Sequence, residues 1–198
     1  MINRQKFALL ATITCIAGFG LNSAEATDID VTATMTASAA VTVANSANLD
    51  FGGIDFVTAH SGTVELGPDG NAALAGGAAN LTLTGVPAAG QLDVTSSAGT
   101  IEVSCDATAV IGDGSTDLTI TEIKWDVTAV NYATAANTCA GLGTSAVAID
   151  TGVSNDPSIL VGAELTIGSN ALNGSSGSTP FDTSTGGGDP VTFRFVYQ

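Results

Sequence analysis

The N-terminal part of the chain carries a strict alternation of apolar and polar residues. Every odd position from Ile29 to Val43 is apolar, whereas Asp, Thr and Ser occupy most of the even positions between them. A period of two residues predicts a β-strand with one buried face. Residues 27–43 would extend over roughly 55 Å at about 3.3 Å per residue, so one small domain is not expected to cover them all. An apolar-faced strand at a free terminus is what β-strand addition between subunits requires.

The last nine residues predict a second notable strand, with Val191, Phe193, Phe195 and Tyr197 on one face. This strand holds two of the seven Phe and one of the two Tyr residues. Because aromatic side chains are scarce in this chain, their concentration here indicates a strand that packs into the core rather than a frayed end.

Short β-strands separated by turn signals are predicted along the rest of the chain. The candidate strands are residues 49–57, 62–66, 80–84, 91–95, 100–105, 117–121, 123–130, 147–149, 159–161 and 165–167. Pro68-Asp69-Gly70 is typical of the turns between them. Apolar positions change from even to odd near Glu122, which predicts a bulge or turn there and places Trp125 in the core. About ten short strands without a convincing amphipathic helix predict an all-β sandwich or barrel.

The first 26 residues have the features of a secretory signal peptide. A basic start is followed by the apolar stretch Phe7 to Leu21, and Ala24-Glu25-Ala26 fits the small-x-small cleavage pattern. The apolar run is short for a retained membrane helix, and the residues around Cys15 suit a lipidation box poorly. We therefore expect an exported mature chain that begins near Thr27 and has no membrane span.

The mature chain is strongly acidic. Of the four basic and 19 acidic residues, Arg4, Lys6 and Glu25 lie in residues 1–26, so the mature chain keeps two basic and 18 acidic residues and a net charge of −16. Such a surface repels nucleic acid and anionic lipid, so neither is an expected partner.

Calcium binding is a further candidate role for these carboxylates. Residues 113–117 have acids at the first and fifth positions and Ser at the third, but Leu118 stands where an EF-hand has Gly and Lys124 where it has Glu. A solvated turn is the better interpretation of this segment.

Two cysteines, Cys105 and Cys139, remain after removal of the signal peptide. An even number of cysteines in an oxidising compartment predicts a disulfide, with two buried free thiols as the alternative. The bond would close a loop of 35 residues, which the loop-entropy model values at about 4 kcal/mol.

Catalytic motifs are missing from the sequence. The chain has one His, His60, and contains neither a Gly-x-Ser-x-Gly elbow nor a His-Glu-x-x-His helix. A carboxylate pair could hydrolyse glycosides, but few aromatic residues are available to build a sugar cleft. We expect no enzyme and no cofactor, and we expect His60, in a turn-like segment, at the surface.

Several segments resemble a widespread, pilin-like family of secreted bacterial proteins with no assigned function. The segments are Ala47-Asn48-Leu49-Asp50-Phe51-Gly52-Gly53-Ile54, residues 62–70 and residues 85–94, together with the aromatic C-terminal strand. More distantly, the two terminal strands are similar to those of chaperone-usher pilins and spore-coat-U-like fimbrial subunits.

The pilin resemblance implies an immunoglobulin-like β-sandwich completed by a strand from a neighbouring subunit. Residues 27–39 would form the donor extension and residues 40–198 a single domain. Ile29, Val31, Ala33, Met35 and Ala37 would enter a groove bordered by Val191, Phe193, Phe195 and Tyr197. The position of Cys105 and Cys139 in mid-chain departs from many such pilins, which leaves the strand order open.

The resemblance also implies a role and a location. The chain would be a structural subunit of a fimbrium at the cell surface, exported through the periplasm and bound head-to-tail to copies of itself. A periplasmic chaperone and an outer-membrane assembly platform are possible partners. The alternative is a self-contained secreted β-sandwich that folds its N-terminal strand into its own sheet and binds calcium, a glycan or a surface partner.

Overall fold

The computed structural model describes residues 41–96, 99–144, 146–150, 157–175, 180–185 and 187–197. Residues 1–40, with the predicted signal peptide and donor extension, lie outside these ranges. The strands are β1 (Val41–Ala47), β2 (Gly53–Leu66), β3 (Ala72–Thr84), β4 (Gly90–Ser96), β5 (Thr100–Cys105), β6 (Ala109–Gly112), β7 (Asp117–Asp126), β8 (Asn137–Thr138), β9 (Val147–Asp150), β10 (Ser158–Ile167) and β11 (Phe193–Tyr197). Two short 3₁₀ helices, η1 (Tyr132–Thr134) and η2 (Ala171–Gly174), complete the described elements.

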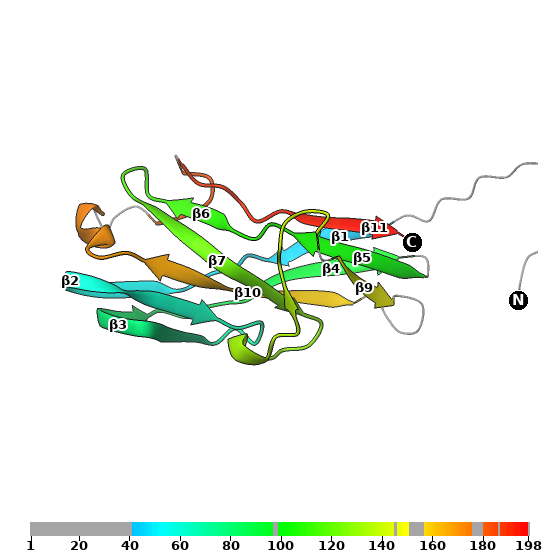
Figure 1. Ribbon diagram of the computed structural model, residues 1–198, viewed down its shortest axis with the longest axis horizontal. Helices are drawn as coiled ribbons and strands as arrows, with labels where there is room; N and C mark the ends of the chain where they lie inside the picture. Colours follow the sequence, from blue (N-terminus) through cyan, green and yellow to red (C-terminus); the bar gives the residue numbers. More distant parts are fainter. Residues whose placement is uncertain are drawn as a thin grey trace, which may run out of the picture. The chain divides into compact units, whose positions relative to one another are not determined.

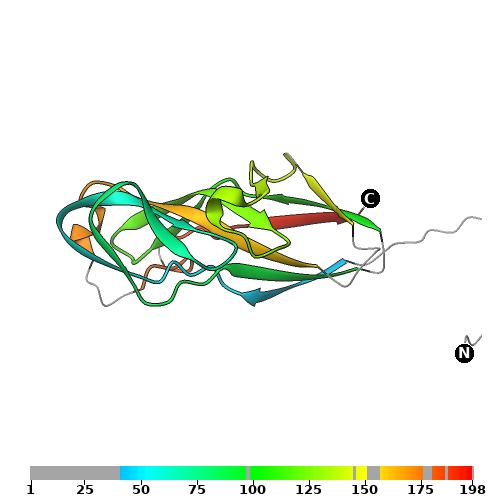
Figure 2. The same ribbon diagram turned by 90° about the horizontal axis from the view of Figure 1, so that it is seen from below.

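The strands form two antiparallel sheets (Figure 1). In the larger sheet the order β1-β4-β10-β2-β3 is extended by β7, which pairs with β10 and carries β6 and β8. The smaller sheet has the order β11-β5-β9. Figure 2 shows β9, β5 and β11 on one side of β10, β4 and β1. The described chain is therefore an all-β sandwich, as the sequence predicted.

The core lies between the two sheets and is supplied by alternate residues of the central strands. In β10 the odd residues from Ile159 to Ile167 are all buried, because side chains of a strand point alternately to its two faces. Trp125 is 2% exposed, which confirms its predicted place in the core. The predicted irregularity at Glu122 is also present, since Glu122 has a φ of 43° and the register between β7 and β10 shifts beside it.

Some strand boundaries differ from the prediction. Residues 53–66 form one strand with bulges instead of two strands, and residues 158–167 are likewise continuous. Continuity of β10 depends on Gly162, where a Cβ atom would overlap the carbonyl oxygen of Leu66. The Ala- and Gly-rich first half of β3 was not predicted, because its composition has low intrinsic strand preference, and β6, which has only four residues, was not predicted either.

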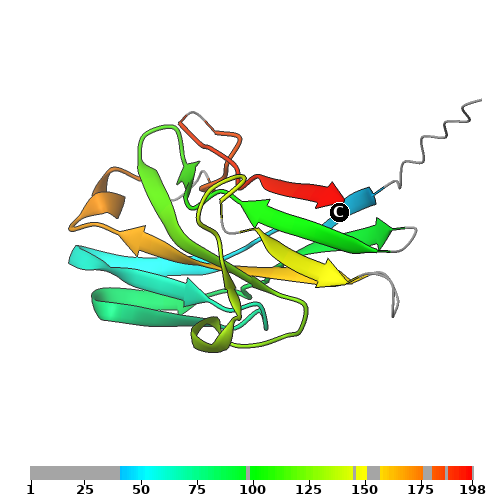
Figure 3. The same cartoon turned by 45° about the vertical axis from the view of Figure 1, so that its right-hand side comes forward.

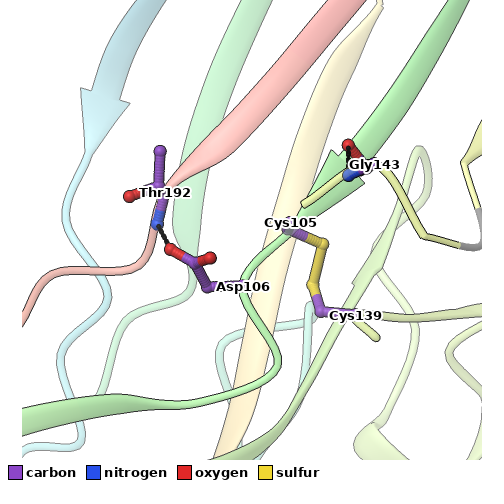
Figure 4. Close-up of a disulfide and its surroundings, with 6 residues drawn as sticks. Cys105, Asp106, Cys139, Gly143 and Thr192 are labelled. Atoms are coloured by element: carbon purple, nitrogen blue, oxygen red, sulfur yellow. Dashed lines mark hydrogen bonds between the residues drawn. A yellow bond between two sulfur atoms is a disulfide. The ribbon is translucent and has the colours of Figure 1, made fainter. Parts of the chain in front are cut away.

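A disulfide between Cys105 and Cys139 joins the smaller sheet to the larger one (Figure 4). The two Cα atoms are 5.1 Å apart. On one side of the bond, Cys139 donates its backbone N–H to the carbonyl of Ile123 in β7 at 2.8 Å. On the other side, the N–H of Gly143 donates to the Oγ of Ser104 at 3.0 Å. The predicted disulfide therefore fixes the loop after β8 across the face of β5.

His60 is buried, so its predicted surface position is wrong. The side chain is 1% exposed, and its Nε2 accepts a hydrogen bond of 3.0 Å from the backbone N–H of Leu172. With Nε2 as an acceptor, the neutral ring carries its proton on Nδ1, which lies 3.1 Å from the carbonyl oxygen of Val57. The imidazole thus attaches η2 to β2, a long-range contact that no local pattern reveals.

Helices of the length and apolar character needed to cross a membrane do not occur in the described ranges.

Candidate functional site

Among the described strands, β1 and β11 have one ladder partner each, as do β3, β6, β8 and β9. β1 pairs with β4 at one edge of the larger sheet, and β11 pairs with β5 at one edge of the smaller sheet. Val41 lies opposite Ser96 and Tyr197 opposite Ile101, so β1 starts near the place where β11 ends (Figure 3). The two strands therefore run in opposite directions, and each has a row of backbone N–H and C=O groups that no described strand uses.

A groove of about 1180 Å³ lies between these two edges. Its floor is made of buried core residues of β7 and β10, namely Leu118, Ile120, Val161 and Leu165. One wall is formed by residues 47–56, which run from the last residue of β1 into the start of β2, and the other by residues 180–183 and 190–193 with Phe195. The groove therefore has an apolar floor and walls of mixed polarity, and two unpaired strand edges border it.

The C-terminal strand presents its aromatic face to this groove. Val191, Phe193 and Phe195 pack against the core but are only partly buried, and the rings of Phe193 and Phe195 lie 6.5 Å apart between centroids. Arg194 and Val196 are exposed on the opposite face. The predicted alternation is confirmed for these residues; the side chain of Tyr197 lies outside the described part, and its backbone pairs with Ile101.

Both edge strands are held in place by polar contacts. At the start of β11, the N–H of Thr192 donates to the Asp106 carboxylate at 3.1 Å, and the N–H of Asp106 donates to the carbonyl of Thr192 at 3.0 Å (Figure 4). On β1, the hydroxyl of Ser46 donates to Asp93 of β4. Hydrogen bonds from Gln91, Ser46 and Ser158 lower the pKa of the Asp93 carboxyl to about 2. The groove is therefore bordered by strands whose positions are fixed on their paired sides.

The structure brings together residues that sequence reasoning did not connect. Phe51 and Ile54, both from the predicted strand at residues 49–57, line the groove together with Phe181, which follows a Gly- and Ser-rich stretch more than 100 residues later. A Phe at position 181, directly after a Gly- and Ser-rich stretch, was the available signal, because a large apolar residue in a polar loop usually packs against something. The predicted donor residues Ile29, Val31, Ala33, Met35 and Ala37 lie outside the described residues.

The acidic segment at residues 113–117 forms a turn. The carboxylate of Asp113 accepts hydrogen bonds of 2.8 Å from the backbone N–H groups of Ser115 and Thr116. The bonds from Ser115, Ser175 and Thr116 lower the pKa of Asp113. Within the described ranges, no three His, Cys, Asp or Glu side chains are grouped so that they could hold a metal ion. The carboxylate of Asp113 thus serves the turn between β6 and β7.

A family model covers most of this fold. Residues 41–181 match the family described as a domain of unknown function, DUF4402. The chain belongs to this family. The DUF4402 match begins at the first residue of β1 and ends at Phe181, ahead of β11. No curated protein and no solved structure matches the chain significantly.

Proposed function

We propose that this chain is a structural subunit of an extracellular filament, in which the groove between β1 and β11 binds a β-strand of the neighbouring subunit. The observation that carries the proposal is the groove itself, which has an apolar floor and lies between two unpaired strand edges. An unpaired strand edge is a template for a further strand, so an occupant is expected beside β1 or β11.

A β-strand has the chemistry that this groove requires. Its backbone would supply hydrogen bonds to the free edge of β11, while alternate apolar side chains would cover Phe193, Phe195 and the floor residues. A small molecule could cover the floor but would leave the row of backbone donors and acceptors without partners. The arrangement therefore favours an extended peptide.

The chain contains a segment with the required pattern in residues 28–37. Its odd positions are Ile29, Val31, Ala33, Met35 and Ala37, and it directly precedes the first strand of the domain. A strand of ten residues spans about 33 Å. The alternation thus offers one apolar face for the groove and one polar face for solvent.

A neighbouring subunit is a better source of this segment than the same subunit. To enter its own groove, the segment would have to reverse direction just before Val41 and run back beside β1. With a two-residue turn, the odd residues of the segment would lie opposite even residues of β1, whose side chains are on the outer face. Because directly opposed residues of a hairpin share a face, the odd side chains would then lie on the outer face as well. A three-residue turn would retain them but favours Gly in the left-handed position, and residues 36–40 are Thr, Ala, Ser, Ala and Ala. The sequence before β1 therefore disfavours self-complementation.

A contact between the extension of one subunit and the groove of the next is head-to-tail, so it propagates into a fibre. The expected location is the cell surface after export through the periplasm. An unfilled groove also explains why a periplasmic chaperone and an outer-membrane assembly platform would be needed before assembly, since an open edge invites aggregation.

Electron microscopy of the mature protein from its native cell surface, with gels of boiled and unboiled samples, tests the proposal. We expect thin filaments and a ladder that collapses only on boiling. The double variant Val31→Asp with Met35→Asp should form neither filaments nor a ladder. The matched control Thr32→Asp with Thr34→Asp, on the opposite face, should form filaments and the ladder as the unmodified chain does. Compact monomers from the unmodified chain, or filaments from the first variant, would contradict the proposal and favour the self-contained binding module.

A further inference from the structure

Arg194 occupies a distinctive position on the edge strand. It lies in β11 between Phe193 and Phe195, whose side chains face the groove, so Arg194 points to the outer face of the same strand. It is exposed, and within the described residues no acidic side chain forms an ion pair with it. A positive charge therefore stands at the edge where the proposed donor strand would pair.

Positive charge is scarce in this molecule. The chain after residue 26 has two basic residues, Lys124 and Arg194, against 18 acidic ones. Lys124 is already engaged, with its Nζ 3.9 Å from Glu122 Oε2 and 4.0 Å from the centre of the Tyr132 ring. Arg194 is thus the uncommitted basic side chain of the described residues.

The surroundings of Arg194 leave it able to turn toward a new strand. Its side chain lies across β5, where Nη1 would be 3.5 Å from a Cβ atom at position 143. The nearest acid in register is Glu102 of β5, which lies opposite Val196 and therefore diagonal to Arg194. Rotation toward the free edge would break no described ion pair.

We propose that Arg194 binds the acidic end of the donor strand, Asp28 and Asp30 of a second copy, and thereby sets the register of the joint between subunits. The inference rests on the proposed function. When Ile29 and Val31 face the groove, Asp28 and Asp30 lie on the outer face, which is the face of Arg194. Residues directly opposite on neighbouring strands have Cβ atoms about 5 Å apart and diagonal ones about 7–8 Å, so both carboxylates come within reach.

The charge of Arg194 can help to fix the pairing register of the donor strand, which the apolar alternation alone does not fix. A slip of one residue would turn every apolar side chain outward, but a slip of two residues retains the faces. The small side chains Ala33 and Ala37 discriminate weakly between such registers. The even positions after Asp30 are Thr32, Thr34, Thr36 and Ser38, so a slip that brings Thr34 or a later residue opposite Arg194 would leave it with uncharged neighbours, whereas a slip of two residues from Asp28 to Asp30 keeps a carboxylate there.

The test compares full-length mature chains that carry the charges in normal and exchanged positions. The variants are Arg194→Glu, the pair Asp28→Lys with Asp30→Lys, and the combination of all three. Filaments are incubated in dilute detergent, and the rate at which the unboiled ladder shortens is measured. Since exposed cross-strand ion pairs are individually weak, we expect Arg194→Glu to dissociate about three- to tenfold faster and the combination to return to within about twofold of the unmodified rate.

Net charge is controlled by Thr119→Glu with Val127→Glu, two exposed positions on and after β7 that add the same two negative charges. This control should dissociate at the unmodified rate. If Arg194→Glu behaves like the unmodified chain while Val31→Asp with Met35→Asp abolishes filaments, the role of Arg194 is wrong and the proposed function stands. Lack of rescue by the combined variant also overturns the role of Arg194. If the unmodified chain forms no filaments, the proposed function itself fails.

Discussion

Replacement of Phe195 by Ala should affect two different free energies, that of unfolding the subunit and that of separating subunits. Truncating a fully buried Phe costs about 3–5 kcal/mol. In the subunit Phe195 is only partly buried at the groove wall, so about half of this cost, roughly 1.5–2.5 kcal/mol, should appear in unfolding. The other half of the cost should appear in the free energy of separating subunits, because a donor strand covers the ring in the filament.

The two contributions can be measured separately. Urea denaturation of a monomeric background, Val31→Asp with Met35→Asp, gives the free energy of unfolding with and without Phe195→Ala. Dissociation of filaments in the unmodified background gives the other part, and 1.5–2.5 kcal/mol corresponds to a roughly ten- to seventyfold weaker joint. Val196→Ala, on the outer face of the same strand, is the matched control and should change either quantity little.

One result would refute this reasoning. If Phe195→Ala lowers the free energy of unfolding by the full 3–5 kcal/mol and leaves filament dissociation unchanged, the ring is already covered within the subunit. The groove would then be filled by its own chain, and a donor strand from a neighbour would have no place.

Two further predictions concern the fold that positions the groove. Replacing both Cys105 and Cys139 by Ser should lower the free energy of unfolding by about 4 kcal/mol, measured by urea denaturation, and reduction of the unmodified chain should reproduce this loss; an unchanged midpoint would contradict it. The pKa of Asp93 is lowered to about 2 by hydrogen bonds from Gln91, Ser46 and Ser158, so its stabilising contribution is complete above the unfolded pKa near 4 and is lost as the pH falls toward 2. Urea midpoints between pH 7 and pH 2 should therefore fall less for Asp93→Asn than for the unmodified chain, and parallel curves would exclude this contribution.

Local patterns were sufficient where a strand has one buried face and a normal composition. β5 was predicted with its observed bounds, because its apolar residues alternate and Cys105 ends the run. The change of phase at Glu122 located the bulge in β7, since a period of two cannot change parity without an extra residue. The aromatic face of β11 followed from the same rule.

Other features depend on contacts between distant parts of the chain. The first half of β3 is a strand because β2 supplies its hydrogen bonds, although Ala and Gly have little strand preference. His60 is buried because η2, more than 100 residues later, donates a backbone N–H to its ring. Neither partner can be identified from the residues around the position itself.

The sequence by itself determined the all-β class, the pairing of Cys105 with Cys139 and the alternation of the two terminal segments, and it predicts an export signal in residues 1–26. Each of these follows from composition or from a period of two residues. Tertiary structure alone decided that β1 and β11 border one groove, that Phe51, Ile54 and Phe181 join its walls, and that Arg194 stands on its outer edge. The physical reason is that a strand pattern specifies which side chains are buried, whereas the order of strands in a sheet specifies which edges remain unpaired.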